Sequence, residues 1–248
     1  MAATVVIPAR YGSTRFPAKI LASSTGRPLV QHVVDQALQC NRVGQVLVAT
    51  DDARIADALA PFGTQVVMTS PDHQSGTDRI AEVARNLTGP DSQIIVNVQG
   101  DEPEIEPSII DGLIALLEDG ESTADMATAA TPFPPGADVN DPNLVKVALG
   151  LAGRAVFFSR SVIPFRRDAD FEGNSAYHLH LGIYAYRRDF LLRFASWAPT
   201  PLEMTEKLEQ LRVLEHGGTI RVLTVNRASH GIDTAEQYEA FVQRMSRQ

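Results

Sequence analysis

The sequence predicts an α/β fold in which helices cover both faces of a mostly parallel sheet and a β-rich insertion interrupts the pattern. Four apolar runs of strand length in the first hundred residues show no polar alternation, as expected for strands that are buried on both faces. Amphipathic helical patterns separate these runs, which is typical of strand–helix–strand units. After about residue 128, consecutive strands replace this alternation.

The first half of the chain alternates predicted strands and helices. The opening run TVVIPA is followed by a helical pattern from Pro28 to Cys40, in which the proline suits the first turn. The predicted apolar face of this helix consists of Leu29, Val30, Val33, Val34, Ala37 and Leu38. Further strands are predicted at 45–50, 65–69 and 93–99, and further helices at 53–62 and 77–89.

The second half is less regular. The run LVKVALGLAGRAVFFSR predicts two strands joined by a glycine-containing turn, and HLGIYAY predicts a third strand. We assign residues 129–192 to a β-rich insertion that forms a lid or a dimer surface, within one domain that spans residues 1–248. After the insertion we predict one helix that ends at Gly217, a strand at 219–225 and a closing helix at 234–245.

The composition excludes several classes of protein. A chain of 248 residues with 44% hydrophobic content can build a core without disulfides, and Cys40 is its only cysteine. No apolar stretch approaches the roughly 18–20 residues needed to cross a bilayer, and no secretory leader pattern is present, so we expect a soluble cytoplasmic protein. The formal net charge of −8 argues against general nucleic-acid binding. An acidic protein that binds an anion needs a few well-positioned cations.

Ligands of parallel α/β sheets bind beyond the carboxyl ends of the strands. Four loops of this chain lie there, at residues 9–19, 51–52, 70–77 and 100–104. The first loop, ARYGSTRFPAK, contains no acid and combines cations with small residues, namely Arg10, Arg15, Lys19, Gly12 and Ser13. This combination favours a phosphate cradle, although the loop is neither a Walker A sequence nor a GxGxxG turn. A solvated basic loop is the structural alternative.

Two acidic residues are candidates for holding a metal ion. Asp101 follows a buried strand, with Gly100 allowing a sharp turn, and a carboxylate there can hold Mg²⁺ against substrate phosphates. The alternative is an acid that caps the next segment. Asp233 follows a strand and a glycine, but an acid before Thr-Ala-Glu is also an ordinary helix N-cap.

The remaining polar segments carry less information. SPDHQSGTDR joins a strand to a helix with small and polar residues, so it can read a base through backbone groups while Ser75 or Thr77 caps the helix. His178 and His180 lack a nearby cysteine or helix-spaced histidine that would complete a zinc site, and we interpret His178 as a packed or surface residue. Periodicity alone does not single out a functional charge in EKLEQLR.

Together the segments resemble a known family. IPARYGSTRFPAK, ATDD, DHQSGTDR, VNVQGDEP, SR, HLGIYAYR, LEQLRVL and GIDT occur in the order found in 3-deoxy-manno-octulosonate cytidylyltransferases, also called CMP-Kdo synthetases. The resemblance covers residues 4 to about 240, and it implies a Rossmann-like nucleotide-diphospho-sugar transferase fold and a homodimer formed through the insertion. It also implies that CMP passes from CTP to the anomeric hydroxyl of 3-deoxy-D-manno-octulosonate (Kdo), for lipopolysaccharide synthesis.

The same resemblance implies roles for individual residues. The residues expected to meet the CTP phosphates are Arg10, Ser13, Arg15 and Lys19, and those expected beside the cytidine are Gln74 and Ser75. Asp101 and Asp233 are expected to hold Mg²⁺, and with Arg10 and Lys19 they form the predicted catalytic set. The residues expected in the sugar-acid pocket are Arg79, Gln99, Arg160, His180, Glu209 and Gln210.

Two positions depart from the family pattern. Ala18 stands where the family often has glycine, and it would be strained if the loop needs a positive φ there. Leu179 stands where a basic residue is common, so a cation near the sugar carboxylate is missing. Two alternatives stay open: a cytidylyltransferase for another sugar acid, such as a sialic acid or amino-Kdo, and a non-catalytic nucleotide-sugar sensor. The joint presence of Asp101, Asp233, Arg10 and Lys19 speaks against the sensor. A dehydrogenase is the least favoured function, because the first turn lacks the required glycine pattern.

Overall fold

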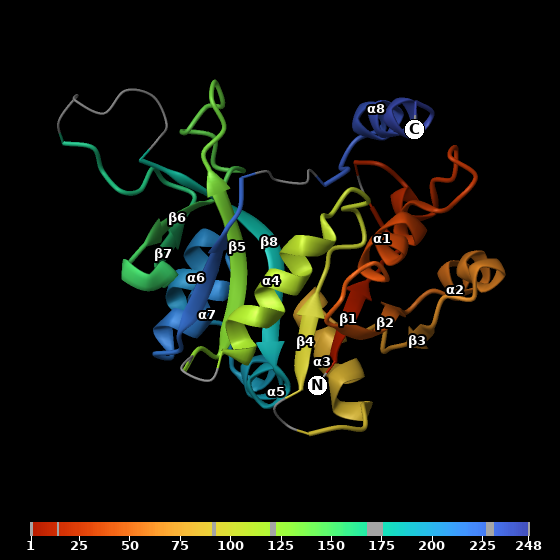
Figure 1. Cartoon of the computed structure of the whole chain (residues 1–248), viewed down its shortest axis with the longest axis horizontal. Coiled ribbons are helices and arrows are strands. Elements are labelled where there is room, and N and C mark those ends of the chain that lie inside the picture. The colour runs from red at the N-terminus through yellow and green to blue at the C-terminus, as the bar shows by residue number, and fades with distance from the viewer. Residues whose placement is uncertain are drawn as a thin grey trace. The chain divides into compact units, whose positions relative to one another are not determined.

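The computed structural model of the chain describes residues 2–13, 15–90, 93–119, 123–167, 176–226 and 231–247. The chain divides into two compact units, Met1–Asp111 with Ser229–Gln248, and Gly112–Ala228. We refer to them as unit 1 and unit 2 and describe each by itself (Figure 1). Helix α4 (Pro107–Glu118) begins in unit 1 and ends in unit 2.

Unit 1 contains a parallel sheet with the strand order β3-β2-β1-β4. Its strands are β1 (Ala3–Pro8), β2 (Val43–Thr50), β3 (Val66–Met68) and β4 (Ile94–Asn97). In the centre Val5 lies opposite both Val46 and Val96, and all three side chains are buried. The apolar runs without polar alternation thus form strands covered on both faces, as predicted.

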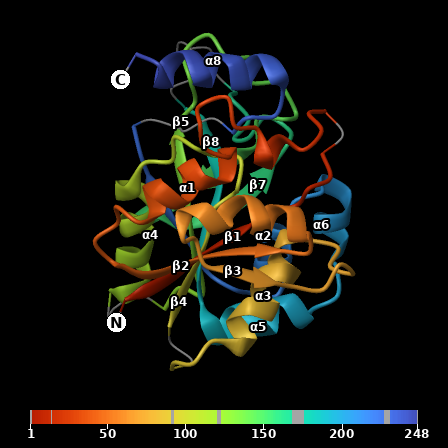
Figure 2. The same ribbon diagram turned by 90° about the vertical axis from the view of Figure 1, so that its right-hand side faces the viewer.

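Helices cover both faces of this sheet. They are α1 (Leu29–Ala37), α2 (Ala53–Leu59) and α3 (Gly76–Asn86). Helix α8 (Ala235–Met245) packs instead near the start of α1, where Tyr238 and Phe241 share a buried cluster with Leu29. Figure 2 shows α1 and α2 over one face of the sheet and α3 over the other. Right-handed crossovers require this arrangement, because the chain moves outward from β1 to β3 and then returns past β1 to β4. The direction of winding therefore reverses between β1 and β4.

The apolar face of α1 is largely as predicted, with one error. The predicted positions from Leu29 to Ala37 are buried, whereas Leu38 is 64% exposed. Leu38 is the C-cap residue of α1, so it no longer lies on the buried face of a continuing helix.

Unit 2 contains a mixed sheet. Strand β5 (Met126–Pro132) pairs antiparallel with β8 (His178–Arg187) and parallel with β9 (Ile220–Thr224). The predicted hairpin is confirmed as β6 (Lys146–Leu149) and β7 (Ala155–Ser159), and β6 also pairs with β8 at Leu179. The expected insertion at 129–192 lies inside this larger unit.

The helical part of unit 2 corrects one prediction. The single helix predicted to end at Gly217 is two short helices, α6 (Pro201–Glu206) and α7 (Gln210–Glu215). The break falls at Lys207, whose φ of 53° is left-handed and ends α6. Arg212 on α7 then turns back to Glu203 on α6 with an Nε–Oε2 distance of 2.7 Å. The buried ion pair explains why the chain folds back instead of continuing as one helix.

The α-helices α4 and α5 (Arg188–Ser196) and the strand β5 were not predicted. The predicted α/β fold with helices flanking a mostly parallel sheet is nevertheless confirmed. No helix within the described parts of the chain has both the length and the apolar character to span a membrane.

Candidate active site

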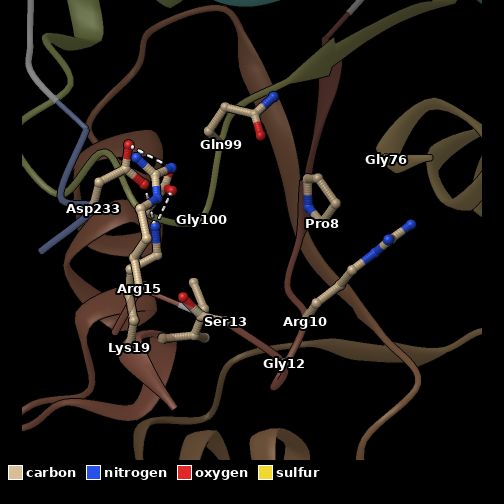
Figure 3. Close-up of a pocket in the computed structure, with 12 residues that line it drawn as sticks. Pro8, Arg10, Gly12, Ser13, Arg15, Lys19, Gly76, Gln99, Gly100 and Asp233 are labelled. Carbon is tan, nitrogen blue, oxygen red and sulfur yellow. Dashed lines mark hydrogen bonds and ion pairs between the residues drawn. The ribbon is translucent and has the colours of Figure 1, made fainter. Parts of the chain in front are cut away.

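A pocket of about 390 Å³ opens at the carboxyl edge of the unit 1 sheet, where β1 and β4 lie side by side. Ligands of open α/β sheets bind at the position where the winding direction reverses, and this pocket occupies that position. The residues that line it are Pro8, Arg10, Gly12, Ser13, Arg15, Lys19, Ile20, Gly76, Gln99, Gly100, Asp101 and Asp233. Figure 3 shows Arg15, Lys19 and Asp233 gathered on one side of Pro8 and Arg10 on the other.

The loop after β1 reaches the pocket through a strained turn. Ala18 has φ 55° and ψ 24°, the left-handed conformation that favours glycine, so the expected strain is present. Phe16 anchors the loop by packing on Tyr238 of α8, with ring centroids 5.6 Å apart. Lys19 follows the turn and is only 8% exposed, with its ammonium group inside the pocket.

The loop after β4 positions Asp101. A Cβ atom on Gly100 would lie 3.1 Å from the Pro8 carbonyl oxygen, so a side chain there would press against β1. The Ile232 N–H donates to the Asp101 carbonyl oxygen at 2.8 Å and joins the segment before α8 to this loop. Asp233 thereby lies beside Asp101 although the two residues are far apart in sequence.

Asp233 is not the N-cap of α8. That position belongs to Thr234, whose hydroxyl accepts from the Gln237 N–H, while the Gln237 side chain accepts from the Thr234 N–H. The carboxylate of Asp233 is therefore free of capping and faces the pocket. The structure decides against the capping alternative that the sequence left open.

Two cations neutralise the two carboxylates. Lys19 Nζ lies 2.6 Å from Asp101 Oδ2 and 2.9 Å from Asp233 Oδ1, and Arg15 Nη2 lies 3.1 Å from Asp233 Oδ2. Burial alone would lower the pKa of Lys19, but the hydrogen bonds and charges of Asp101 and Asp233 outweigh burial and raise it. Lys19 is therefore protonated at neutral pH and bridges both acids.

Other predicted CTP contacts are divided between the pocket and its border. Arg10 and Ser13 line the pocket, whereas Gln74 and Ser75 do not appear in its lining. The Ser75 hydroxyl accepts from the Asp78 N–H at 3.1 Å and caps α3, as predicted. The Gln74 amide donates to the Asp72 carbonyl oxygen at 2.9 Å, on an exposed loop.

The two predicted sugar-acid residues of unit 1 lie in different environments. Gln99 lines the pocket. Arg79 is completely buried and does not line it: its Nη2 lies 2.9 Å from Asp51 Oδ2, and its Nη1 donates to the Thr69 hydroxyl. In this structure Arg79 therefore joins α3 to the ends of β2 and β3.

Four predicted sugar-acid residues lie in unit 2. Arg160 donates through Nε to the Glu206 carbonyl oxygen at 2.6 Å and through Nη1 to the Pro142 carbonyl oxygen at 2.8 Å. Gln210 is buried, and its Oε1 accepts from the Tyr184 hydroxyl at 3.4 Å. Glu209 is the N-cap residue of α7, directly before Gln210.

His180 is held among aromatic and polar groups of unit 2. Its ring lies edge-on to Phe158 with centroids 4.9 Å apart, and its Nε2 lies 3.0 Å from the Thr128 hydroxyl oxygen. Burial lowers the pKa of His180 to about 3, so the ring is neutral at physiological pH. A neutral imidazole can exchange hydrogen bonds with a ligand but adds no positive charge.

Leu179, the second departure from the family pattern, lies in a hydrophobic cluster. It is 7% exposed and packs with Phe133 and Tyr177. Successive residues of a strand point to opposite faces, so Leu179 and His180 face different sides of β8.

The similarity of this chain to known proteins agrees with this geometry. A family model described as Cytidylyltransferase matches residues 4–221 of the chain. This chain belongs to the cytidylyltransferase family. The 3-deoxy-manno-octulosonate cytidylyltransferase of Geobacter metallireducens is 48% identical over 100% of this chain and 99% of its own, and that of Idiomarina loihiensis is 47% identical over 96% of both chains.

A solved structure is similarly close. It is described as CMP:2-keto-3-deoxy-manno-octonic acid synthetase complexed with CTP, and it has a TM-score of 0.92 and 39% sequence identity. The similarity covers 100% of this chain and 99% of that chain. The predicted enzyme class, a nucleotidyltransferase, is confirmed at the level of the family.

Two acids line the pocket of this cytidylyltransferase, Asp101 and Asp233, and together they could hold a divalent cation. Each has one oxygen within hydrogen-bonding distance of the same Lys19 nitrogen, so the two oxygens lie close to one another. Within the described residues, no group of three or more His, Cys, Asp and Glu side chains could hold a metal ion. Two carboxylates suit an ion that takes its remaining ligands from water and phosphate.

Glu206 holds one end of β7 in this cytidylyltransferase, a role that its sequence context does not predict. Its carboxylate accepts from the Ser159 hydroxyl at 2.6 Å and from the Arg160 N–H at 2.9 Å, and so it holds the end of β7. Helical spacing does not reveal this contact, because it places Glu206 on the charged face of one continuous helix. The actual end of α6 at Glu206 turns it toward β7.

Proposed function

We propose that this chain transfers CMP from CTP to the anomeric hydroxyl of Kdo and releases pyrophosphate. The observation that carries the proposal is the pocket where Lys19 bridges Asp101 and Asp233 while Arg10 and Ser13 line the same cavity. The names of the full-length relatives and the CTP complex of the similar structure support the same reaction.

The chain's own residues position and neutralise the triphosphate. Arg10, Arg15 and Lys19 place three positive charges in the pocket of a protein whose formal net charge is −8, and Ser13 adds a hydroxyl donor. Charge-assisted hydrogen bonds of this kind are stronger than neutral ones, and they stabilise a transition state in which charge moves onto the leaving pyrophosphate. Lys19 and Arg10 are the catalytic cations in this proposal.

We propose Mg²⁺ as the cofactor, with Asp101 and Asp233 as its protein ligands. When bound, Mg²⁺ would supply positive charge against the phosphates. Lys19 occupies both carboxylates in this structure, so it must release them when the ion binds. Its ammonium group would then be available to a phosphate.

The reaction needs no covalent enzyme intermediate. The anomeric oxygen of Kdo forms a bond to the α-phosphorus, and the bond from that phosphorus to the oxygen that it shares with the β-phosphorus breaks. That oxygen leaves with pyrophosphate, and the hydroxyl proton is lost to solvent. Direct in-line attack inverts the configuration at the α-phosphorus. Retention of configuration with a chiral α-phosphorothioate substrate would contradict this mechanism.

The candidates for recognising the sugar acid are Arg160, His180, Glu209 and Gln210 in unit 2, and Gln99 and Arg79 in unit 1. Within the described residues, Gln210 Nε2 is buried and has no hydrogen-bond partner, so it is a donor that a ligand oxygen can satisfy. The neutral ring of His180 can form a hydrogen bond with the sugar acid. Arg160 is held by its hydrogen bonds to the carbonyl oxygens of Glu206 and Pro142. Glu209 can accept from sugar hydroxyl groups.

We propose further that the protein is a cytoplasmic homodimer that supplies activated Kdo for lipopolysaccharide assembly. Large apolar side chains are exposed in the proposed insertion: Leu151 is 94%, Val156 61% and Phe165 87% exposed. Apolar exposure of this kind favours association with a second copy. Sedimentation velocity should give the mass of a dimer, and Phe165→Glu should shift the protein toward monomers.

The function is tested by measuring pyrophosphate release with CTP, Mg²⁺ and Kdo, beside Asp101→Asn and a panel of other sugar acids. We expect release that requires Kdo and falls by at least about 100-fold in Asp101→Asn, because one metal ligand is lost. If the enzyme prefers a sialic acid or amino-Kdo, that sugar acid replaces Kdo as the proposed acceptor. CTP binding without release with any sugar acid would favour the sensor alternative.

A further inference from the structure

The loop between β3 and α3 is held at two points by one carboxylate. Glu82 on α3 accepts from the Ser70 N–H at 3.0 Å and from His73 Nε2. The side chains of Glu82 and His73 are 28% and 20% exposed, so protein surrounds most of this contact. Nε2 of His73 must carry a hydrogen to donate to a carboxylate, which fixes the orientation of the ring.

His73 also contacts the nucleotide pocket, but through its backbone. Its carbonyl oxygen accepts from Arg10 Nη2 at 3.1 Å, and Arg10 lines the pocket. A guanidinium group has five N–H donors, so this contact orients the plane of Arg10 and leaves other donors for phosphate oxygens. His73 thus links Glu82 on one side to a proposed catalytic cation on the other.

Further hydrogen bonds connect the rest of the loop. The Asp72 N–H donates to the Ser70 hydroxyl oxygen at 3.1 Å, and Gln74 donates to the Asp72 carbonyl oxygen. The loop then ends in the capping box of Ser75 and Asp78. Few internal degrees of freedom remain between the point held by Glu82 and the point held by Arg10.

The carboxylate of Glu82 is negatively charged, which suits its role as the acceptor of these two hydrogen bonds. The hydrogen bond from His73 and then the Ser70 N–H lower the pKa of Glu82, so the carboxylate is ionised at neutral pH. An ionised acceptor strengthens both contacts.

We infer that Glu82 and His73 are positioning residues for the nucleotide half of the reaction: they hold the loop that borders the pocket and orient Arg10 toward the CTP phosphates. This inference rests on the proposed function. It gives Glu82, the second acid of the segment TDRIAE, a role in CTP use, although Glu82 does not line the pocket.

Glu82→Ala is the first test. We expect the Kd for CTP, measured by titration calorimetry with Mg²⁺, to rise about tenfold, because Arg10 and the loop lose their common anchor. The KM for CTP should rise by a similar factor, whereas the KM for Kdo should change less than about twofold. A residue that only stabilises the fold would not separate the two substrates.

Asp35→Ala is the matched control. Asp35 on α1 accepts from Gln31 of the same helix and from Arg27, which precedes it. Its side chain is 31% exposed, close to the exposure of Glu82, but it does not line the pocket. We expect it to lower thermal stability without changing either KM. If Glu82→Ala does not fold, Glu82→Gln serves in its place, because the amide keeps the size of the side chain and loses its charge.

A double-mutant cycle with Arg10→Met identifies the route of the effect. If Glu82 acts through Arg10, Glu82→Ala should cost less than about threefold in CTP affinity once Arg10 is absent. If the effects of the two substitutions on CTP affinity multiply, or if Glu82→Ala binds CTP as tightly as the unmodified protein, this inference is wrong. Neither result would contradict the proposed function. If the unmodified protein binds no CTP at all, the proposed function itself fails and this inference fails with it.

Discussion

Replacement of Lys19 with Met tests the charge arrangement of the pocket directly. The ammonium group makes two charge-assisted hydrogen bonds, at 2.6 Å and 2.9 Å, each worth about 1.5–3 kcal/mol. Desolvation of Lys19 opposes this gain, and the 40% exposure of Asp233 weakens the second bond. We therefore expect a net loss of about 2 kcal/mol in the free energy of unfolding, which lowers Tm by about 4–8 °C.

The same substitution should raise the affinity for a divalent cation. Without Lys19, the carboxylates of Asp101 and Asp233 face each other with Arg15 as their remaining partner. We expect the Kd for Mn²⁺, measured by electron paramagnetic resonance without nucleotide, to fall at least about tenfold, because the ion no longer competes with an internal cation. Use of CTP should weaken at the same time.

The stability difference has a defined pH dependence. Because the pKa of Lys19 is raised above 10.5 in the folded protein, its contribution is present in full below pH 10.5 and disappears as pH rises through the higher folded value. The control is Arg244→Met, which removes an exposed ion pair with Glu104 and should cost less than about 1 kcal/mol. An unchanged Tm together with an unchanged Mn²⁺ affinity in Lys19→Met would refute the reasoning.

Three further predictions follow from backbone strain, burial and pairing. Ala18→Gly should raise Tm by about 1–3 °C in a calorimetric scan, because relief of the left-handed strain exceeds the entropy cost of glycine, and Ala152→Gly at φ 59° should act in the same direction. The lowered pKa of His180 makes its contribution to stability complete above pH 6.5 and lost as pH falls toward 3; urea unfolding of His180→Gln should show a smaller loss between pH 7 and pH 4. Arg212→Met should cost about 3–5 kcal/mol in urea unfolding, because it leaves the buried Glu203 carboxylate unpaired, and a cost below 1 kcal/mol would contradict that view.

The sequence predicted the part of the fold where local signals and tertiary structure agree. The strands of unit 1 are apolar and end in polar loops, so their positions and the functional edge of the sheet followed from the pattern. The first loop, Asp101 and Asp233 were selected on the same basis, and the structure brings them together in one pocket.

The missed elements lacked such signals. Strand β5 consists largely of alanine and threonine, which give a weak strand pattern, and its burial comes from its neighbours β8 and β9. The break between α6 and α7 depends on a left-handed lysine and on an ion pair across it, and neither alters the helical spacing of the leucines. Tertiary contacts decided both cases.

The buried position of Arg79 and its contacts inside the protein could not be predicted from its place in DHQSGTDR. A motif residue before an apolar helical run can point either to a ligand or to the protein interior, and the choice depends on what lies beneath it. Here Asp51, which follows β2, and Thr69, which follows β3, accept hydrogen bonds from the guanidinium group. Whether Arg79 also takes part in sugar-acid recognition stays a prediction.

The hydrogen bond from Ile232 to Asp101 has a consequence for the biogenesis of the protein. The ribosome makes Asp101 long before Asp233, because the whole of unit 2 lies between them in the sequence. A nascent chain that has already formed β1 to β4 therefore lacks one carboxylate of the pair and the helix α8 that follows it. The acidic pair of the pocket forms only after the segment that carries Asp233 has left the ribosome and Ile232 has bonded to the loop after β4.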